Sequence, residues 1–212
     1  MVGGDLMIDK IYETLVCIEG LNGSGKATQT KLLLGYLDKK YNKTKTIEFP
    51  IYDSPSGKLL TDYLHSGINK DNTYYNALLY ELNRFEIYLK MKSWLEDGYW
   101  VVLDRYFYSN WTFQKVLAND DTFLDWVKNI EVPLPKPKYN IFLDVPIDVT
   151  IGLMKDKKKD WHEEDEEFMR TVYIEYKQIA KDHSWIVVQC MEGGKLLAPR
   201  EIHKKLVKEL GL

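Results

Sequence analysis

The strongest constraint on this chain is the segment Gly20-Leu21-Asn22-Gly23-Ser24-Gly25-Lys26-Ala27-Thr28, which has the form G-x-x-x-x-G-K. The apolar, β-branched run Thr14–Glu19 precedes it and is typical of a buried parallel strand. Thr28–Lys40 follows, with leucines at the spacing of an amphipathic helix. A strand, a glycine loop and a helix in this order predict a phosphate-binding loop rather than a glycine-rich turn that binds nothing.

The composition of this segment explains how it would hold an anion. Glycines let the backbone curl so that its N–H groups point inward. The N-terminus of the following helix adds a partial positive charge. Lys26 adds a full charge on a long, mobile side chain, suited to the outer phosphates of a nucleotide.

One position departs from the usual loop. A Ser or Thr hydroxyl that ligates Mg²⁺ normally follows the lysine, whereas this chain has Ala27 and places its hydroxyl at Thr28. Thr28 lies about 200° around the helix axis from Lys26, so we expect that it does not simply replace the missing ligand. Mg²⁺ usually keeps several waters, so other carboxylates can hold it through water.

The run Trp100–Leu103 predicts a second buried strand that ends in Asp104-Arg105. A carboxylate at this place sits beside the metal in phosphate-loop enzymes, so we expect Asp104 to hold Mg²⁺ through water. The guanidinium of Arg105 can bind two phosphate oxygens at once. The alternative for this pair is a salt bridge at the end of the strand.

Composition narrows the class of protein. The chain has 212 residues and a net charge of -3, which favours one α/β domain over residues 1–212 and gives no basic surface for nucleic acid. No run approaches the ~20 apolar residues of a membrane span. The two cysteines, Cys17 and Cys190, are interpreted as buried thiols of a reducing compartment. We therefore predict a cytoplasmic protein without membrane or nucleic-acid partners.

Five apolar runs alternate with helical patterns, which favours a parallel sheet with helices on both faces and binding at the carboxyl ends of the strands. The extended segment Val132–Pro137 is interpreted as a stiff connector, and residues before about Tyr12 as a loose extension. The predicted strands are Thr14–Glu19, Thr44–Phe49, Tyr99–Leu103, Tyr139–Leu143 and Ser184–Gln189; the predicted helices are Thr28–Lys40, Ser56–His65, Tyr74–Asp97, Phe107–Leu117, Thr122–Ile130, Ile147–Met154, Glu163–Asp182 and Pro199–Leu210.

Two further segments carry charges in a pattern. In the long predicted helix, Tyr80, Arg84 and Tyr88 share one face, while an apolar stripe of leucines (Leu78, Leu82 and Leu89, with Phe85) occupies another. By spacing alone, an exposed cation–π ladder is the favoured interpretation of the first face. Residues 155–163 contain Lys155, Lys157, Lys158 and Lys159, which suit either a solvated surface or a lid over the phosphates.

Taken in order, the motifs resemble the thymidylate (dTMP) kinase family over nearly the whole chain, from about Leu15 to about Ala180. No single motif is specific, but the ordered set is. The matching segments are Glu19-Gly20…Gly25-Lys26-Ala27-Thr28-Gln29, Phe49-Pro50…Gly57-Lys58, Asn83-Arg84-Phe85-Glu86, Asp104-Arg105-Tyr106…Ser109, Leu134-Pro135-Lys136-Pro137 and Phe142-Leu143-Asp144-Val145-Pro146.

The resemblance implies an α/β P-loop NTPase fold, with a five-stranded parallel sheet, helices on both faces, a lid segment at about 155–163 and a homodimer. It implies transfer of the γ-phosphoryl of ATP to the 5′-phosphate of dTMP with Mg²⁺, ATP lying on the loop Gly20–Thr28. By position in the family motifs, it implies catalytic roles for Lys26, Asp104 and Arg105, an acceptor site made of Asn22, Phe49, Tyr80, Arg84, Arg105, Ser109 and Phe113, and lid cations at Lys155, Lys157, Lys158 and Lys159.

The chain also departs from the family pattern at the acceptor side. Asn22 stands where an acid usually lies near the sugar, Tyr52 where many members have an arginine, and Glu163 about where an aromatic often meets the nucleotide. These departures keep two alternatives open. One is a kinase for another pyrimidine nucleotide, such as dUMP or dCMP; the other, motivated by Ala27, is a nucleotide-binding protein without catalysis.

Overall fold

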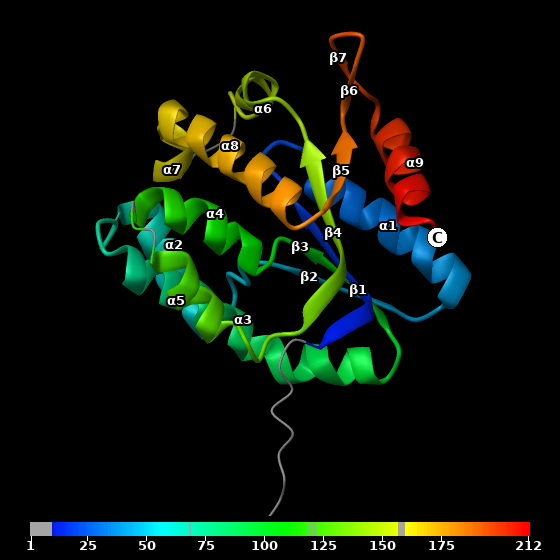
Figure 1. Cartoon of the computed structure of the whole chain (residues 1–212), viewed down its shortest axis with the longest axis horizontal. Helices are drawn as coiled ribbons and strands as arrows, with labels where there is room; N and C mark the ends of the chain where they lie inside the picture. The colour runs from blue at the N-terminus through cyan, green and yellow to red at the C-terminus, as the bar shows by residue number, and fades with distance from the viewer. Residues whose placement is uncertain (1–9, 68, 119, 121, 157–159) are drawn as a thin grey trace, which may run out of the picture.

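The computed structural model describes residues 10–67, 69–118, 120, 122–156 and 160–212. Its centre is a five-stranded sheet in the order β2-β3-β1-β4-β5, in which every neighbouring pair is parallel (Figure 1). This arrangement confirms the predicted fold class. The strands are β1 (Ile11–Glu19), β2 (Thr44–Glu48), β3 (Trp100–Asp104), β4 (Lys136–Asp144) and β5 (Ile186–Gln189).

The helices are α1 (Lys26–Tyr41), α2 (Pro55–Ser66), α3 (Thr73–Glu96), α4 (Phe107–Ala118), α5 (Phe123–Ile130), α6 (Ile147–Leu153), α7 (Trp161–Glu164), α8 (Glu166–Asp182) and α9 (Pro199–Leu210). Helices α1 and α9 cover one face of the sheet, while α3, α4 and α8 lie over the other (Figure 1). No helix in the described part of the chain is long and apolar enough to cross a membrane.

The central strand shows why the sheet is covered on both faces. In β1, Leu15 and Cys17 join the core beneath α3, α4 and α8, whereas Val16 and Ile18 join the core beneath α1 and α9. All four side chains are fully buried. Successive strand residues point to opposite faces, so a continuous apolar run is what a strand covered twice requires.

Most boundaries differ from the sequence predictions by one or two residues, and three differences are larger or change the element. β1 begins at Ile11 and β4 at Lys136, because Ile11 and Tyr12 pair with Lys136 and Pro137 across the two strands. The end of the proline segment is therefore strand, not connector. The predicted helix Glu163–Asp182 is two helices, because Asp165 is extended and caps α8 by accepting a hydrogen bond from the backbone N–H of Phe168 at 2.9 Å.

A short antiparallel hairpin, β6 (Met191–Glu192) with β7 (Lys195–Leu196), follows β5 and is absent from the sequence predictions. Its turn is Gly193-Gly194, with φ of 56° and 76°. Both residues have positive φ, which glycine adopts without steric cost. Two-residue strands are too short to show an alternating pattern, so only the glycine pair indicates this turn in the sequence.

Helix α3 buries the side that spacing alone predicts to be exposed, and it exposes the leucine side. Leu78, Leu82 and Leu89 are exposed over 45%, 50% and 74% of their surface, whereas Arg84 is only 2% exposed. The buried side of α3 is partly polar, because it packs against the start of α2 and against α4 through side chains that hydrogen-bond one another. The prediction of an exposed cation–π ladder is therefore wrong for Arg84.

Candidate active site

The loop between β1 and α1 curls as its glycines predict. Gly20 has φ of 149° and Gly23 has φ of 82°, and a Cβ on Gly23 would lie 3.0 Å from Cγ of Met154. The carbonyl of Thr150 lies 3.2 Å from the same position, so a side chain there would be strained by the positive φ and crowded by the end of α6, which favours glycine. The carbonyl of Leu21 accepts hydrogen bonds from the backbone N–H of Ser24 at 3.2 Å and from Nζ of Lys26 at 3.0 Å.

The start of α1 presents backbone donors to the space above the loop. The first backbone acceptor in this helix is the carbonyl of Gly25, which receives the N–H of Gln29 at 3.0 Å. Within the described residues, the N–H groups of Lys26, Ala27 and Thr28 have no hydrogen-bond partner. Unpaired donors at a helix N-terminus form a site suited to phosphate.

Lys26 is buried at this helix start, and its environment changes its acidity. Burial, followed by the charge of the Arg105 guanidinium, lowers the pKa of Lys26 to about 7, against the opposing effect of Asp104 and Glu19. An ammonium taken out of water prefers its neutral form until an anion arrives beside it. A phosphate bound in the adjacent cavity would therefore stabilise the charged form of Lys26.

The end of β3 holds the other two predicted catalytic residues, Asp104 and Arg105. Arg105 has φ of 66°, a conformation uncommon for residues other than glycine, and its backbone N–H donates to the carbonyl of Ile18 at 3.0 Å. Its Nη1 donates to Oγ of Ser109 and to the hydroxyl of Tyr176, both at 3.1 Å. The guanidinium is thus fixed at one end by two neutral oxygens.

Glu19 is the residue that organises this corner, and the sequence assigned it no role beyond the family motif. Its fully buried carboxylate accepts hydrogen bonds from the N–H of Tyr106 at 2.8 Å, from Ser109 at 2.8 Å and from Tyr176 at 3.0 Å. It also lies 4.0 Å from Arg105. Burial raises the pKa of Glu19, opposed first by the charge of Arg105. Position at the end of a buried strand is the signal in the sequence that could have identified it.

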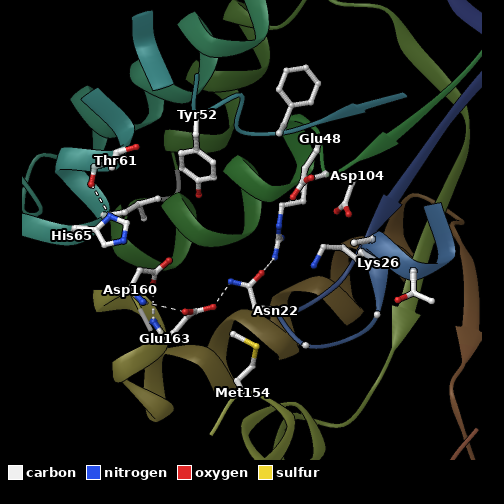
Figure 2. A pocket seen from close by; sticks show the side chains of 17 residues that line it. Asn22, Lys26, Glu48, Tyr52, Thr61, His65, Asp104, Met154, Asp160 and Glu163 are labelled. Atoms are coloured by element: carbon white, nitrogen blue, oxygen red, sulfur yellow. Dashed lines mark hydrogen bonds between the residues drawn. The ribbon is translucent and has the colours of Figure 1, made fainter. Parts of the chain in front are cut away.

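Two cavities open at the carboxyl ends of the strands. The larger, of 730 Å³, lies over the loop and α1 (Figure 2). The smaller, of 150 Å³, lies between α2, α3 and α4. The cavities meet where the loop, β2, β3 and the segment before α7 converge. The residues that line both are Asn22, Glu48, Phe49, Tyr52, Leu64, Arg105 and Asp160.

Most predicted nucleotide contacts reach these cavities. The larger is lined by Asn22, Gly23, Gly25, Lys26, Ala27 and Thr28 of the predicted loop, and by Asp104 and Arg105. Three loop residues, Gly20, Leu21 and Ser24, lie behind the lining, because the loop turns Leu21 into the core. The smaller cavity is lined by the predicted acceptor residues Asn22, Phe49, Tyr80, Arg105, Ser109 and Phe113.

Arg84 is the predicted acceptor residue that the structure does not bring to either lining. Its guanidinium forms a buried ion pair with Glu81, one turn earlier in α3, and Glu81 also accepts a hydrogen bond from Nδ2 of Asn110 at 2.9 Å. A buried guanidinium needs a carboxylate partner, and this one lies in its own helix. No periodicity argument could identify that choice.

The smaller cavity also has polar lining residues that the sequence did not single out. Gln114 is fully buried, and its amide lies close enough to the hydroxyl of Tyr63 to oppose the rise in pKa that burial causes in that group, although neither amide atom has a partner at ordinary hydrogen-bond geometry among the described residues. Asn110 and His162 lie beside it. Burial lowers the pKa of His162 to about 3, so its ring is neutral, and its Nε2 lies 3.1 Å from the hydroxyl of Tyr63. Gln114 lies four residues after Asn110 on α4, a spacing that could have indicated it.

The described part of the predicted lid presents acids, not lysines, to the larger cavity. Asp160 and Glu163 line it, whereas Lys155 is exposed and does not. Lys157, Lys158 and Lys159 lie outside the described residues. Burial and the neighbouring Glu163 raise the pKa of Asp160 to about 6.

The carboxylates in the larger cavity suit a Mg²⁺ ion held mainly by phosphate and water. Asp104 and Glu48 line it, and within the described residues no hydrogen bond engages the Asp104 carboxylate. The described residues contain no group of three or more His, Cys, Asp and Glu side chains placed for a metal. Mg²⁺ needs only one or two carboxylates when it bridges phosphates. Thr28 lines the same cavity, and whether it replaces the missing metal ligand stays a prediction.

Comparison with known proteins agrees with this geometry. A family model described as thymidylate kinase matches residues 18–197. The chain is 32% identical over 205 residues to the thymidylate kinase of Plasmodium falciparum, covering 95% of this chain and 91% of that protein. It is 30% identical over 176 residues to a probable thymidylate kinase of Saccharolobus solfataricus, covering 83% and 88%. The structure of thymidylate kinase from Candida albicans matches with a TM-score of 0.73 at 26% identity, covering 94% and 92%. The chain therefore belongs to the thymidylate kinase family.

Proposed function

We propose that this chain performs the reaction of its family with the residues that meet at the junction of the two cavities. The enzyme transfers the γ-phosphoryl of ATP to the 5′-phosphate of dTMP, giving ADP and dTDP. The larger cavity takes the phosphates of ATP, and the smaller one takes the nucleoside of dTMP. The observation that carries this assignment is that Asn22 and Arg105 line both cavities, between the phosphate loop and the aromatic pocket.

On the donor side, the unpaired N–H groups at the start of α1 and the Nζ of Lys26 bind the β- and γ-phosphates. Asp104 would hold Mg²⁺ through water, and Thr28 and Glu48 line the same cavity. When bound, Mg²⁺ would supply positive charge that neutralises the phosphates. Lys155 and the three lysines that follow Asp156 are the candidates for lid cations.

On the acceptor side, Arg105 binds the 5′-phosphate of dTMP. Ser109 and Tyr176 hold Nη1, and Asn22 accepts one N–H of Nη2. Nε has no hydrogen-bond partner among the described residues, so the Nε N–H and the second N–H of Nη2 are left for the phosphate. The Nε–Nη2 edge of a guanidinium matches two oxygens of one phosphate. The base stacks between Tyr80 and Phe113, and the amide of Gln114 offers one donor and one acceptor to its edge.

Phosphoryl transfer needs no covalent intermediate on the protein. The acceptor phosphate is itself the nucleophile, so the protein positions two phosphates in line and stabilises the charge that spreads over the transferred group. Lys26 from the donor side and Arg105 from the acceptor side supply that charge. A catalytic base is not required, because the attacking phosphate oxygen already carries negative charge.

The assay that tests this function measures ADP release from ATP and Mg²⁺ with dTMP, dUMP, dCMP, dGMP and AMP in parallel. The largest kcat/KM is expected with dTMP. The Candida albicans enzyme is described as having broad substrate specificity, so the panel decides how selective this pocket is. A different preferred acceptor would move specificity to Asn22 and Tyr52. Binding of ATP without turnover of any monophosphate would contradict the proposal.

ATP binding is expected to take up a proton above pH 7. The pKa of Lys26 is about 7 in the free site, and contact with phosphate raises it, because the bound anion favours the ammonium form. At pH 8 most Lys26 side chains are neutral before binding and charged after it, so about 0.9 proton enters per site, against about 0.1 at pH 6. Affinity for ATP should therefore fall as pH rises from 7 to 9.

Isothermal titration calorimetry with ATP, without acceptor, in two buffers of different ionisation enthalpy measures this uptake at both pH values. The Lys26→Met variant serves as the control and should show little uptake at either pH. Equal uptake at pH 6 and pH 8, or uptake that persists in the variant, would contradict the assignment to Lys26.

We also propose a homodimer that covers the exposed leucines of α3. Three leucines on one side of a helix are exposed to solvent in the single chain, and Leu59 of α2 is 46% exposed as well. Replacing Leu82 by Glu is expected to yield monomers, because the change places a charge on each side of a twofold contact. Light scattering after size-exclusion chromatography measures the mass. Ile174→Glu, at an exposed apolar residue of α8, should leave the dimer intact; a wild-type monomer, or a dimer of Leu82→Glu, would contradict this face.

A cytoplasmic location fits the supply of dTDP inside the cell and the state of the cysteines. Cys17 and Cys190 are both free and buried. Burial raises the pKa of Cys190 to about 12, which keeps its thiol protonated and unreactive. We propose that both act as small core residues of an intracellular enzyme.

A further inference from the structure

Asn22 joins two other segments of the active site through the two ends of its amide. Its Oδ1 accepts a hydrogen bond from Nη2 of Arg105 at 2.5 Å, at the end of β3. Its Nδ2 donates a hydrogen bond to Oε1 of Glu163 in α7. The phosphate loop therefore links the acceptor-side arginine to a carboxylate of the lid helix. Figure 2 labels the Asn22 and Glu163 side chains of this link.

The lid end of this link is held by a second set of contacts. Oε2 of Glu163 accepts the backbone N–H of Asp160 at 3.0 Å, and Oδ1 of Asp160 accepts the backbone N–H of Glu163 at 3.0 Å. These reciprocal bonds form a capping box that fixes the Glu163 carboxylate relative to the helix. Behind it, His162 is buried against Tyr63 of α2. The Glu163 carboxylate therefore moves together with helix α7 and does not rotate as a free side chain.

The link crosses the junction of the two cavities. Asn22 and Arg105 line both of them, and Glu163 lines the larger one. Ser109 and Tyr176 already hold Nη1 of Arg105. The contact of Nη2 with Asn22 therefore determines how the guanidinium is oriented about that end. A displacement of α7 would change the contact of Asn22 and, through it, the orientation of the group that receives the acceptor phosphate.

The hydrogen bond between Asn22 and Glu163 has a fixed direction, because the amide donates and the carboxylate accepts. Reversing it requires a substitution at both positions. An amide can accept from Arg105 and donate to Glu163 at the same time. A carboxylate at position 22 would still accept from Arg105 but would face the Glu163 carboxylate without a donor between them. Like charges at that distance repel. Exchanging the acid and the amide between the two positions would restore one hydrogen bond with its direction reversed.

We infer that Glu163 is a positioning residue of this enzyme: it docks the lid helix α7 onto the Asn22 amide and thereby orients Arg105 for the acceptor phosphate. This inference rests on the proposed function for the role of Arg105. Arg105 then takes its orientation for the acceptor phosphate only when α7 is docked. The acceptor site is therefore complete only when the lid helix is in place.

A set of exchange variants tests the link. Asn22→Asp is expected to raise KM for dTMP about tenfold or more, with a smaller change in KM for ATP, because repulsion from Glu163 displaces α7. Glu163→Gln alone should be milder than Asn22→Asp: its single side-chain oxygen can accept from Asn22 or from the backbone N–H of Asp160, so one hydrogen bond is lost, but no pair of like charges is created. The double variant N22D/E163Q should return KM for dTMP to within about threefold of wild type, since the amide introduced at position 163 can donate to the new carboxylate.

Glu164 provides the matched control. It lies next to Glu163 in α7, but its side chain is exposed and does not line either cavity. N22D/E164Q removes the same charge from the same helix without changing the contact, so no rescue is expected. If N22D/E164Q restored KM for dTMP as well as N22D/E163Q does, the loss of one negative charge from α7 would explain the rescue. That result would overturn the inference.

Hydrogen exchange of the peptide spanning residues 160–165 gives a readout without substrate. Exchange should be faster in N22D than in wild type and should return towards wild type in N22D/E163Q. A double variant no better than N22D, or an N22D variant that matches wild type in both readouts, would overturn the inference. A wild-type enzyme without dTMP turnover would overturn the proposed function, whereas the exchange comparison would still decide the docking of α7.

Discussion

Replacing Lys26 by methionine is expected to lower kcat for dTMP phosphorylation by about a thousandfold. Of the described residues that line the larger cavity, only Lys26 and Arg105 are Lys or Arg, and Lys26 alone extends from the phosphate loop. Its Nζ lies 3.0 Å from the carbonyl of Leu21, poised at the start of α1. Methionine keeps most of the length of the side chain but removes the charge that stabilises the transferred phosphoryl.

The fold should survive this change. Lys26 is buried with a pKa lowered to about 7, so folding already disfavours its charged form, and an uncharged side chain of similar length removes that cost. Steady-state kinetics and thermal unfolding of Lys26→Met check both points. Lys31→Met, an exposed residue of the same helix, is the control and should match wild type. A Lys26→Met enzyme that retains a tenth of wild-type kcat would refute the catalytic role.

Replacing Arg105 by lysine should lower kcat/KM for dTMP by about two orders of magnitude or more, with a much smaller effect on ATP binding. The guanidinium makes hydrogen bonds to Ser109, Tyr176 and Asn22 at once. An ammonium is a single point charge and cannot hold these partners while also binding two phosphate oxygens. The lysine variant should therefore behave nearly as poorly as Arg105→Ala.

Kinetics with dTMP as the varied substrate, and calorimetry with ATP, separate the two sites. Arg200→Lys, at an exposed residue of α9, controls for a general effect of the substitution. Added guanidinium ion should restore part of the activity of Arg105→Ala but not of Arg105→Lys, whose side chain still fills the space. An Arg105→Lys enzyme with wild-type kcat/KM for dTMP would show that a point charge suffices and that the fork has no role.

The parts of the active site that are predictable lie close together in the sequence. The phosphate loop and the Asp104-Arg105 strand end follow from local patterns, because a buried strand, a glycine turn and a helix start are specified by neighbouring residues. Both occur where the sequence predicts them. The aromatic residues Tyr80 and Phe113 also line the smaller cavity as expected; their contact with the base remains a prediction.

The parts that are not predictable depend on which elements pack together. Spacing separates a leucine stripe of α3 from the side that carries Arg84, and favours exposure of the latter. The helix buries that polar side instead, with Arg84 paired to Glu81 and held away from both cavities. Helical spacing identifies the sides of a helix but does not say which one faces the protein. For α3, that choice is decided by the buried hydrogen bonds to α2 and α4.

By itself, the amino-acid sequence determined the α/β fold, the phosphate loop and membership of the family, since these depend on short-range periodicity and on ordered motifs. Only the tertiary structure decided the partners of the charged groups. Asn22 and Glu163 are 141 positions apart, and Arg105 and Tyr176 are 71 apart. A buried or half-buried charge is stabilised by whatever polar atom the packing brings within about 3 Å. That neighbour is set by the arrangement of strands and helices, not by position along the chain.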